Sequence, residues 1–205
     1  MIASPPKLGF RHKPLLEKGK LVVVFALIGA LIYLSRPTWP LFLTGAALTL
    51  LGAGLRLWAA GHLTRDQRLA VSGPYAHTRH PFYLGRLFLL LGFALMSGLG
   101  SAFVWIIALG ALGFFFFGYL PRKERREGAR LEQLFGNEFR RYRQNVPAFW
   151  PRVTPYRAAG QARGWSRDLL GAGDGQYSGN KELPTALGTL LLIGLFLARL
   201  LTVHP

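Results

Sequence analysis

The sequence predicts an all-α, polytopic integral membrane protein, in which about five transmembrane helices form a bundle and one amphipathic helix lies on the cytosolic side. Hydrophobic residues make up 51% of the 205 positions, and the mean hydropathy is +0.26. The chain also has a formal net charge of +16, because it has 25 Lys and Arg but only 9 Asp and Glu. The basic residues lie between long uncharged runs, which a soluble nucleic-acid-binding protein would not carry. We therefore predict membrane lipids, and no nucleic acid, as partners.

Five apolar runs supply the predicted transmembrane helices. They cover residues 21–35, 41–60, 82–96, 103–120 and 185–201. Some runs are shorter than the roughly 20 residues that a bilayer core requires, so boundary residues must extend them. A signal peptide is the alternative interpretation of the first run, but the turn-forming segment 36–40 follows it in place of a small-residue cleavage pattern.

Small residues in the second run predict a close contact with a neighbouring helix. Gly45, Gly52 and Gly54 have no side chain that would hold that helix away. Arg56, near the end of the same run, is expected to extend its charge to the membrane surface. Pro121 is expected to end the fourth helix.

The distribution of Lys and Arg predicts the orientation in the membrane. The N-terminal residues 1–20 hold 5 of them, loop 61–81 holds 3 and segment 121–183 holds 13, whereas the two loops on the other side hold Arg36 alone. Five alternating helices place the three basic segments on one side, which the positive-inside rule makes the cytoplasm. The N-terminus is then cytoplasmic and the C-terminus outside. We interpret an arginine-rich chain without Cys as prokaryotic, and so place it in a cytoplasmic membrane.

Residues 122–142 have the pattern of an amphipathic cytosolic helix. Apolar residues recur at helical spacing among charged ones: Leu131, Leu134, Phe135, Phe139 and Tyr142. We divide the chain into residues 1–72, a basic tail with two membrane helices, residues 73–151, the functional core, and residues 152–205, a cytosolic segment with the last membrane helix. The last part is expected to anchor the chain.

The candidate site begins in the polar loop that leads into the third apolar run. This loop carries Tyr75, Arg79, His80 and, at the first helical position, Pro81, whose missing N–H costs nothing there. Tyr83 follows within the first helical turn. One helical hairpin later the chain returns to the same membrane face, so we expect the amphipathic helix to lie beside this loop.

The amphipathic helix adds Glu124, Glu127 and Arg130 to the candidate site. Carboxylates, guanidinium groups and aromatic rings together suit a zwitterionic cofactor that bears an amino group, a carboxylate and a flat base. The alternative interpretation is a loop-to-helix junction at His80 with surface ion pairs between these glutamates and Arg130 or Lys123. Because the chain has no Cys, no thiolate metal site or cysteine nucleophile exists, and no metal is predicted.

Two motifs flank the predicted hairpin. The first is Gly-Pro-Tyr at 73–75 followed by Arg-His-Pro-Phe-Tyr-Leu-Gly at 79–85; the second comprises Glu127, Leu131, Phe135-Gly136, Glu138-Phe139 and Tyr142, and then Pro147. In this order they resemble the isoprenylcysteine carboxyl methyltransferase and phospholipid methyltransferase superfamily of integral membrane enzymes. The resemblance covers about residues 73–151, well over a third of the chain.

This resemblance implies an S-adenosylmethionine-dependent methyltransferase, with a cofactor pocket open to the cytosol and a lipophilic substrate that enters from the bilayer. It makes one set of residues the first half of the cofactor site: Arg79, His80, Pro81, Tyr83 and Gly85. Tyr75 lies beside them. The acceptor is left open among an isoprenylcysteine-like carboxylate, a phospholipid amine and a small thiol, and the oligomeric state is not specified.

The resemblance also implies roles for the charged residues. Glu127 would hold the ammonium of the cofactor, and Arg79 or Arg130 its carboxylate. His80 would position the cofactor or act as a general base. The family's second glutamate is replaced by Gly128, for which Glu124 could substitute from one helical turn earlier.

Two alternatives stand beside methyl transfer. A sterol-reductase-like membrane reductase that uses NADPH shares the Arg-His-Pro-x-Tyr-x-Gly element. Such proteins typically have Asn where Phe82 stands and an acidic residue where Arg86 stands, and so we rank this alternative second. The non-enzymatic alternative is a membrane scaffold whose basic cytosolic face binds anionic lipid.

Overall fold

The computed structural model describes residues 25–26, 28–64, 67–98, 102–157, 164–170 and 182–203. The chain divides into two compact units, Met1–Leu34 and Ser35–Pro205. In the first unit the described residues 25–26 and 28–34 are helical. The basic tail, the start of the first predicted membrane helix, Arg65 and the loop at 99–101 lie outside the described residues.

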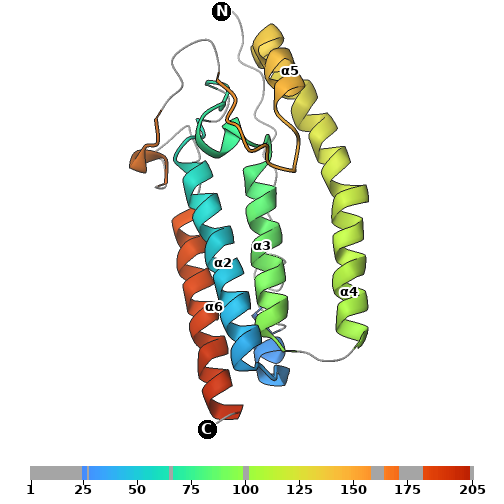
Figure 1. The fold of residues 1–205 in the computed structure, drawn as a ribbon, viewed down its shortest axis with the longest axis vertical. Coiled ribbons are helices and arrows are strands. Elements are labelled where there is room, and N and C mark those ends of the chain that lie inside the picture. The colour runs from blue at the N-terminus through green and yellow to red at the C-terminus, as the bar shows by residue number, and fades with distance from the viewer. Residues whose placement is uncertain are drawn as a thin grey trace, which may run out of the picture. The chain divides into compact units, whose positions relative to one another are not determined.

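The second unit is built from helices, and the residues that the structure describes contain no strand, which confirms the all-α prediction. Its long helices are α2 (Trp39–Ala60), α3 (Pro81–Met96), α4 (Ala102–Gly113), α5 (Leu120–Asn145) and α6 (Glu182–Val203). Short 3-10 turns stand at Gly73–Ala76 (η1) and Arg167–Leu169 (η3), and a π-helical segment, η2 (Phe114–Tyr119), joins α4 to α5. Helices α2, α3 and α6 run side by side, with α2 next to both of the others (Figure 1).

Glycines bring α2 and α3 into close contact. A Cβ atom at Gly52 would lie 2.7 Å from the carbonyl oxygen of Gly85, and one at Gly45 would lie 2.6 Å from that of Gly92. The backbones therefore meet where each helix lacks a side chain, as predicted for Gly45 and Gly52. Gly54 is different, because a Cβ there would have nothing within 4 Å.

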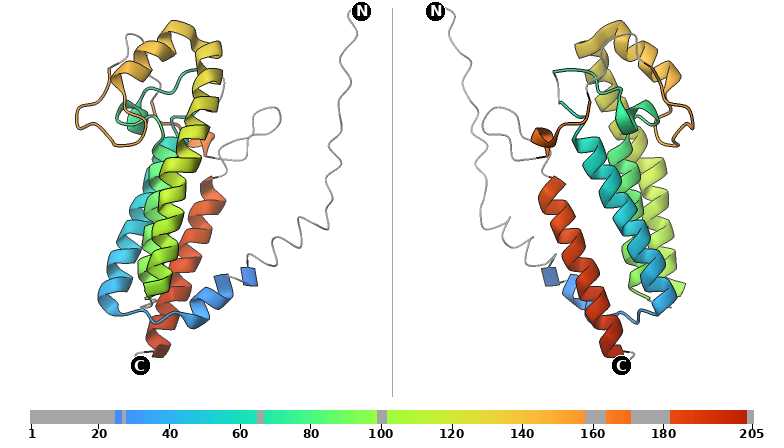
Figure 2. Two further views of the ribbon diagram at one scale, coloured as in Figure 1. Left: turned by 90° about the vertical axis from the view of Figure 1, so that its right-hand side faces the viewer. Right: turned by 60° about the vertical axis from the view of Figure 1, so that its left-hand side comes forward.

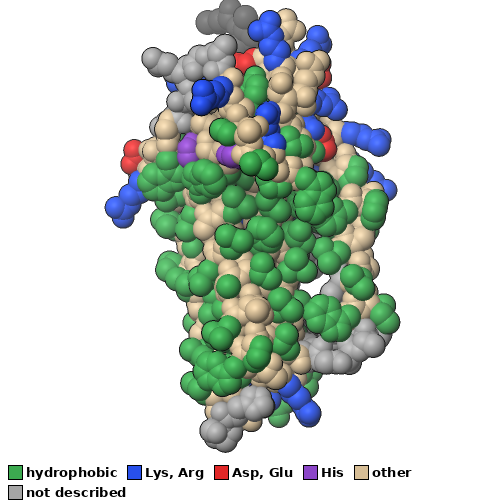
Figure 3. Space-filling view, in the orientation of Figure 1, with side chains coloured by type: hydrophobic (Ala, Val, Ile, Leu, Met, Phe, Trp, Pro, Cys, Tyr) green, Lys and Arg blue, Asp and Glu red, His purple; other side chains and the backbone are tan. Residues whose placement is uncertain are grey.

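Two helices, α2 and α6, are long and apolar enough to cross a membrane. Of the most apolar 18-residue stretch of each helix, only 28% of the residues in α2 and 17% of those in α6 are buried. The core helix of a soluble protein would be mostly buried. Apolar side chains therefore cover the outside of these helices, and charged side chains gather at the end that carries the loop before α3 (Figure 3). Helix α3, with 16 residues, is apolar but shorter.

Pro121 does not end the fourth helix, contrary to the sequence prediction. The chain stays helical from α4 through η2 into α5 (Figure 2). In η2 the N–H of Leu120 donates to the carbonyl of Phe115, five residues earlier. Such a wider turn is a local irregularity at which a helix accommodates a proline, because the usual four-residue register is already interrupted.

Helix α5 is not the single straight helix that its periodicity predicts. Gly136 interrupts it with φ 50° and ψ −122°, a conformation that only glycine adopts readily. The chain turns at this residue, so that Phe139 and Tyr142 pack with Val71 and Val146 in a small apolar cluster. The second half of α5 is thereby folded back over the loop that precedes α3.

Candidate pocket at the polar end of the helices

The loop before α3 is fixed by the segment that follows α5. The N–H groups of Arg79 and His80 donate to the carbonyls of Pro147 (2.9 Å) and Ala148 (3.1 Å), and the hydroxyl of Thr78 donates to the carbonyl of Phe149 (3.0 Å). These contacts join residues about 70 positions apart in the sequence. The prediction that the loop and the amphipathic helix are neighbours is confirmed.

Further hydrogen bonds join the earlier residues of the same loop to α5 and to the segment after it. The N–H of Arg152 donates to the carbonyl of His77 (3.0 Å), and the N–H of Tyr156 donates to that of Ala76 (2.9 Å). The hydroxyl of Tyr142 donates to the carbonyl of Tyr75 (2.8 Å), and burial raises the pKa of this hydroxyl above its ordinary value. Residues 75–80 are therefore held in one conformation from several directions.

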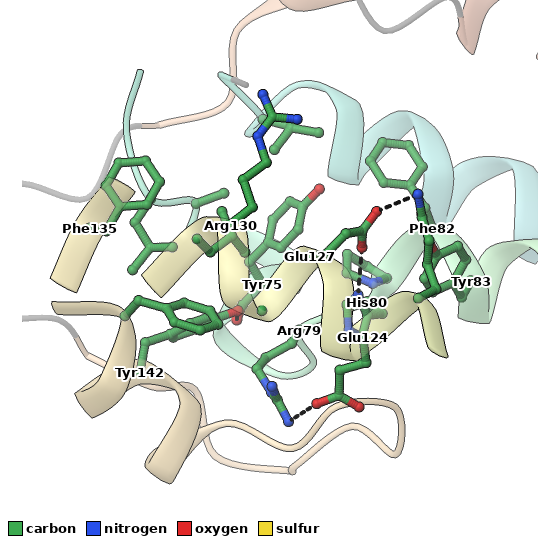
Figure 4. Close-up of a pocket in the computed structure, with 18 of the residues that line it drawn as sticks. Tyr75, Arg79, His80, Phe82, Tyr83, Glu124, Glu127, Arg130, Phe135 and Tyr142 are labelled. Atoms are coloured by element: carbon green, nitrogen blue, oxygen red, sulfur yellow. Dashed lines mark hydrogen bonds and ion pairs between the residues drawn. The ribbon is translucent and has the colours of Figure 1, made fainter. Parts of the chain in front are cut away.

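A cavity of about 510 Å³ lies between this loop, the ends of α2 and α3, and α5. Its volume is typical of sites for small molecules and cofactors. Of the residues predicted from sequence, eight line it: Tyr75, Arg79, His80, Pro81, Tyr83, Glu124, Glu127 and Arg130. In Figure 4 Phe135 and Tyr142 lie at one end and Phe82 and Tyr83 at the other, with Tyr75 and the charged residues between them.

Gly85 does not line the cavity. It stands at the crossing of α3 with α2, where a Cβ would meet the side chain of Arg56 at 2.6 Å and the carbonyl of Gly52 at 2.8 Å. Its place in the motif is thus explained by helix packing. Gly128 does line the cavity, and a Cβ there would lie 4.0 Å from the ring of Phe139.

Ion pairs connect the loop to α5. Arg79 pairs with Glu124 at 2.7 Å, and its Nε donates to the carbonyl of Val146 at 3.0 Å. Glu127 pairs with Lys123 at 3.0 Å, one turn earlier on α5, as the surface-pair interpretation expected. A dashed line marks the Arg79–Glu124 pair in Figure 4. The carboxylates therefore already have cationic partners within the protein.

His80 is the unusual group in the cavity. Its Nδ1 lies 3.9 Å from Glu127, and its buried Nε2 has no hydrogen-bond partner among the described residues. Burial lowers the pKa of His80 below its ordinary value of 6.5, and the nearby carboxylates of Glu127 and Glu124 only partly offset this effect. The ring is therefore neutral at pH 7, and a buried nitrogen without a partner marks a place where a ligand atom would be accommodated.

A third ion pair, which the sequence does not predict, borders the cavity and joins α2 to α6. Nε and Nη2 of Arg56 each donate to one carboxylate oxygen of Glu182, both at 2.9 Å. The side chains are only 11% and 12% exposed, and the Arg56 guanidinium lies 5.4 Å from the centre of the Phe82 ring. Arg56 is therefore held in a buried ion pair, and its extension to the membrane surface stays a prediction. The residues lie 126 positions apart with no shared motif, so no sequence signal could have joined them.

The extension after residue 152 also contributes to this end of the protein. Glu182, the first residue of α6, lines the cavity. The N–H of Ser166 donates to the carbonyl of Gly61 (2.9 Å), and the ring of Trp165 occupies the space beside Gly61. Tyr177, later in the same extension, lies outside the described residues.

The fold and site define an all-helical protein in which a charged, aromatic-lined pocket caps apolar helices. No group of three or more His, Cys, Asp or Glu that could hold a metal ion occurs among the described residues. Residues 61–156 match the model of the ergosterol biosynthesis ERG4/ERG24 family. This range includes the loop before α3, the hairpin and the whole of α5.

Two bacterial proteins are similar in sequence. The chain is 36% identical over 148 residues to the cobalt-zinc-cadmium resistance protein CzcN of Cupriavidus metallidurans, an alignment that covers 67% of this chain and 64% of the relative. It is 31% identical over 105 residues to the nickel-cobalt-cadmium resistance protein NccN of Alcaligenes xylosoxydans xylosoxydans, covering 50% of this chain and 46% of the relative. The matched region thus spans less than two thirds of either relative. No solved structure matches the chain.

The family match overturns the methyltransferase interpretation and, with it, the assignment of S-adenosylmethionine as the cofactor. The matched model is of the sterol reductase type, and it covers both motifs on which the methyltransferase resemblance rested. The physical reason for the error is twofold. The Arg-His-Pro-x-Tyr-x-Gly element is common to both kinds of protein, and the downstream Phe135-Gly136 pair marks a backbone turn at positive φ. Neither feature discriminates between the two chemistries.

Proposed function

We propose that this protein is a membrane-embedded, sterol-reductase-like enzyme that uses NADPH to reduce a lipophilic substrate. The observation that carries the proposal is the cavity: it is rich in arginine, contains a buried unpartnered histidine nitrogen, and stands at the polar end of outward-facing apolar helices. The match over residues 61–156 supports the same class of enzyme.

The residues of the cavity fit a phosphate-bearing dinucleotide. Six cationic side chains line it: Arg56, Arg68, Arg79, Arg86, Lys123 and Arg130. Three of them form ion pairs with Glu182, Glu124 and Glu127. Arg68 and Arg86 are exposed and have no ion pair among the described residues, so they are available for phosphate oxygens. Tyr75 and Phe135 offer rings against which a flat base can stack.

This chain departs from the sterol reductase pattern at Phe82 and Arg86, and we propose a role for each. Phe82 carries the guanidinium of Arg56 over its ring. Arg86 lines the cavity where an acidic residue would be typical. An added positive charge favours the ligand with one more phosphate, which is our reason for proposing NADPH rather than NADH.

When bound, the nicotinamide supplies a hydride, and reduction of a double bond then requires one proton from the protein. His80 and Tyr83 are placed to handle it, because their rings lie 5.2 Å apart at the start of α3 and both line the cavity. The ring of Tyr83 also meets that of Tyr119, another lining residue, edge to face with centroids 6.1 Å apart. Glu127, 3.9 Å from Nδ1 of His80, stabilises a proton on the imidazole when it is transferred there.

The arrangement in the membrane belongs to the same proposal. We infer five membrane-spanning helices, a cytoplasmic pocket and a prokaryotic cytoplasmic membrane. Two helices of sufficient length and apolarity, the outward-facing apolar side chains and the charge asymmetry of the loops support this topology.

Calorimetry on the detergent-purified chain tests the cofactor. NADPH should bind saturably and more tightly than NADH, and Arg86→Gln should weaken NADPH binding by about tenfold, which corresponds to one charge-assisted hydrogen bond. Arg125→Gln, an exposed α5 arginine that does not line the cavity, is the matched control and should leave binding unchanged. Absence of NADPH binding by a folded protein, or saturable binding of S-adenosylmethionine instead, would overturn the proposal.

The named functions of the relatives support a cellular role in resistance to divalent metals. Both CzcN and NccN are named as metal resistance proteins. We propose that this chain contributes to such resistance through its reaction at the membrane. Deletion of its gene should lower the cobalt, zinc or cadmium concentration that stops growth, and wild-type chain but not His80→Gln should restore it. If wild-type chain and His80→Gln restored resistance equally, resistance would not depend on the pocket, and this proposal would be wrong.

A further inference from the structure

The segment after α5 exposes apolar side chains that the protein itself does not cover. Trp150 is 70% exposed and Val153 is 94% exposed, whereas Val146 and Phe149 in the same segment are buried. The buried pair fixes the segment to the protein. The exposed pair is therefore held at the surface on an ordered backbone, and its exposure is not a consequence of a loose chain.

Trp150 continues the apolar outer surface of the α4–η2 helix, and Val153 follows three residues later in the same segment. The indole of Trp150 stacks on Phe116 of η2, with ring centroids 6.3 Å apart and planes 11° from parallel. Two other residues of η2, Phe114 and Phe117, are exposed to 66% and 88%. An apolar surface of this kind, continuous with helices that face outward with apolar side chains, favours contact with lipid.

The residues around the pair match the boundary between acyl chains and headgroups. Tryptophan is enriched at that depth because its ring is apolar and its N–H is polar. Arg152 and Arg157 lie in the same segment, and Arg122 lies in the first turn of α5, just beyond η2. Arginines beside an apolar anchor attract anionic headgroups.

We propose that Trp150 and Val153 insert into the headgroup–acyl boundary of the bilayer, and that this contact sets the depth of the pocket. The segment is hydrogen-bonded to the pocket loop through Pro147, Ala148 and Arg152. A displacement of the segment relative to the membrane therefore moves Arg79 and His80 with it. The inference rests on the proposed membrane topology, but it is independent of the chemistry in the pocket.

Because the chain has no Cys, single cysteines can report depth directly. Val153→Cys, labelled with an environment-sensitive fluorophore, would be placed in nanodiscs of phosphatidylcholine with 30% phosphatidylglycerol, a composition of about one anionic lipid in three. Leu190→Cys on the exposed face of α6 is the control for a membrane-spanning position, and Asn137→Cys, exposed beside the kink in α5, is the control for an aqueous one.

We expect lipids with a quencher near the headgroup to reduce the Val153→Cys signal at least twofold, and the Asn137→Cys signal not at all. Adding Trp150→Ser should remove most of the quenching, whereas Trp150→Phe should retain it, with elution volume and thermal unfolding confirming the fold. Leu190→Cys is read with lipids that carry the quencher deep in the acyl chain, because α6 places this residue far from the headgroups. Quenching there, without headgroup-lipid quenching at Val153→Cys, overturns this inference and leaves the topology standing. A water-free emission spectrum at Val153→Cys without lipid quenching means that a second copy of the protein covers the residue, and it also overturns the inference. Absence of acyl-chain quenching at Leu190→Cys overturns the topology itself and, with it, this inference.

Discussion

Replacing Glu182 by Gln removes the charge that faces Arg56 while keeping the size of the side chain. Breaking a buried ion pair from one side costs about 3–5 kcal/mol, because the remaining charge stays desolvated. Here Arg56 keeps the carbonyl of Phe82 at 3.4 Å and the Phe82 ring, and the introduced amide oxygen can still accept one hydrogen bond. We therefore expect Glu182→Gln to lower the free energy of unfolding by the smallest amount in this range, about 3 kcal/mol. This corresponds to roughly a hundredfold change in the folding equilibrium constant.

The assay is reversible unfolding of the purified protein in mixed micelles with increasing denaturing detergent. The exposed pair Arg140–Glu132, with side chains 63% and 34% exposed, supplies the control. Glu132→Gln should change the free energy of unfolding by less than about 1 kcal/mol. A double-mutant cycle of Arg56→Gln and Glu182→Gln should give a coupling energy above about 1 kcal/mol. Additive effects, or a Glu182→Gln loss no larger than the control, would refute the reasoning.

Three further changes follow from the packing and the pKa shift. Gly52→Ala places a Cβ 2.7 Å from the carbonyl of Gly85 and should lower the thermal unfolding temperature, whereas Gly54→Ala has free space and should not; equal effects would contradict the proposed contact. Gly136→Ala should cost about 1–3 kcal/mol in the same unfolding assay, because φ is +50° there, and no loss would argue against the turn. His80 is held neutral, so the unfolded chain binds a proton that the folded chain does not as the pH falls below 6.5. Stability should be constant above that pH and fall below it, and His80→Gln should flatten the profile; an unchanged profile would contradict the burial of the ring.

The closeness of the pocket loop to α5 was predictable from the sequence, because a helical hairpin must return the chain to the side on which it started. Eight of the nine proposed site residues line one cavity for this reason. The ion-pair partners of Glu124 and Glu127 were not predictable. Which basic side chain pairs with each glutamate depends on side-chain orientations that the residue pattern alone does not specify. Gly85 was placed in the site by its motif, although its position at the crossing of α2 and α3 serves packing.

Other features lacked a sequence signal or carried a misleading one. The apolar pattern of α5 continues on both sides of Gly136, and an isolated glycine inside a helical pattern does not by itself indicate a turn. The π-helical segment before Pro121 arises from the hydrogen-bond register, which residue types alone do not specify. The chemistry was misassigned because the motif shared by two kinds of membrane enzyme establishes a pocket and leaves its cofactor undetermined.

The hydrogen bonds between the pocket loop and the segment after α5 also constrain the order in which the protein folds. They close a loop of chain that contains α3, α4 and the whole of α5, so they cannot form until those helices have been made and have returned to the starting side. Contacts between residues this far apart are entropically expensive to form early. The helices of this loop are therefore expected to assemble first and the pocket last. A nascent chain that ends before Pro147 would contain the hairpin but would lack the backbone partners of Arg79 and His80, and would have no means of ordering the site.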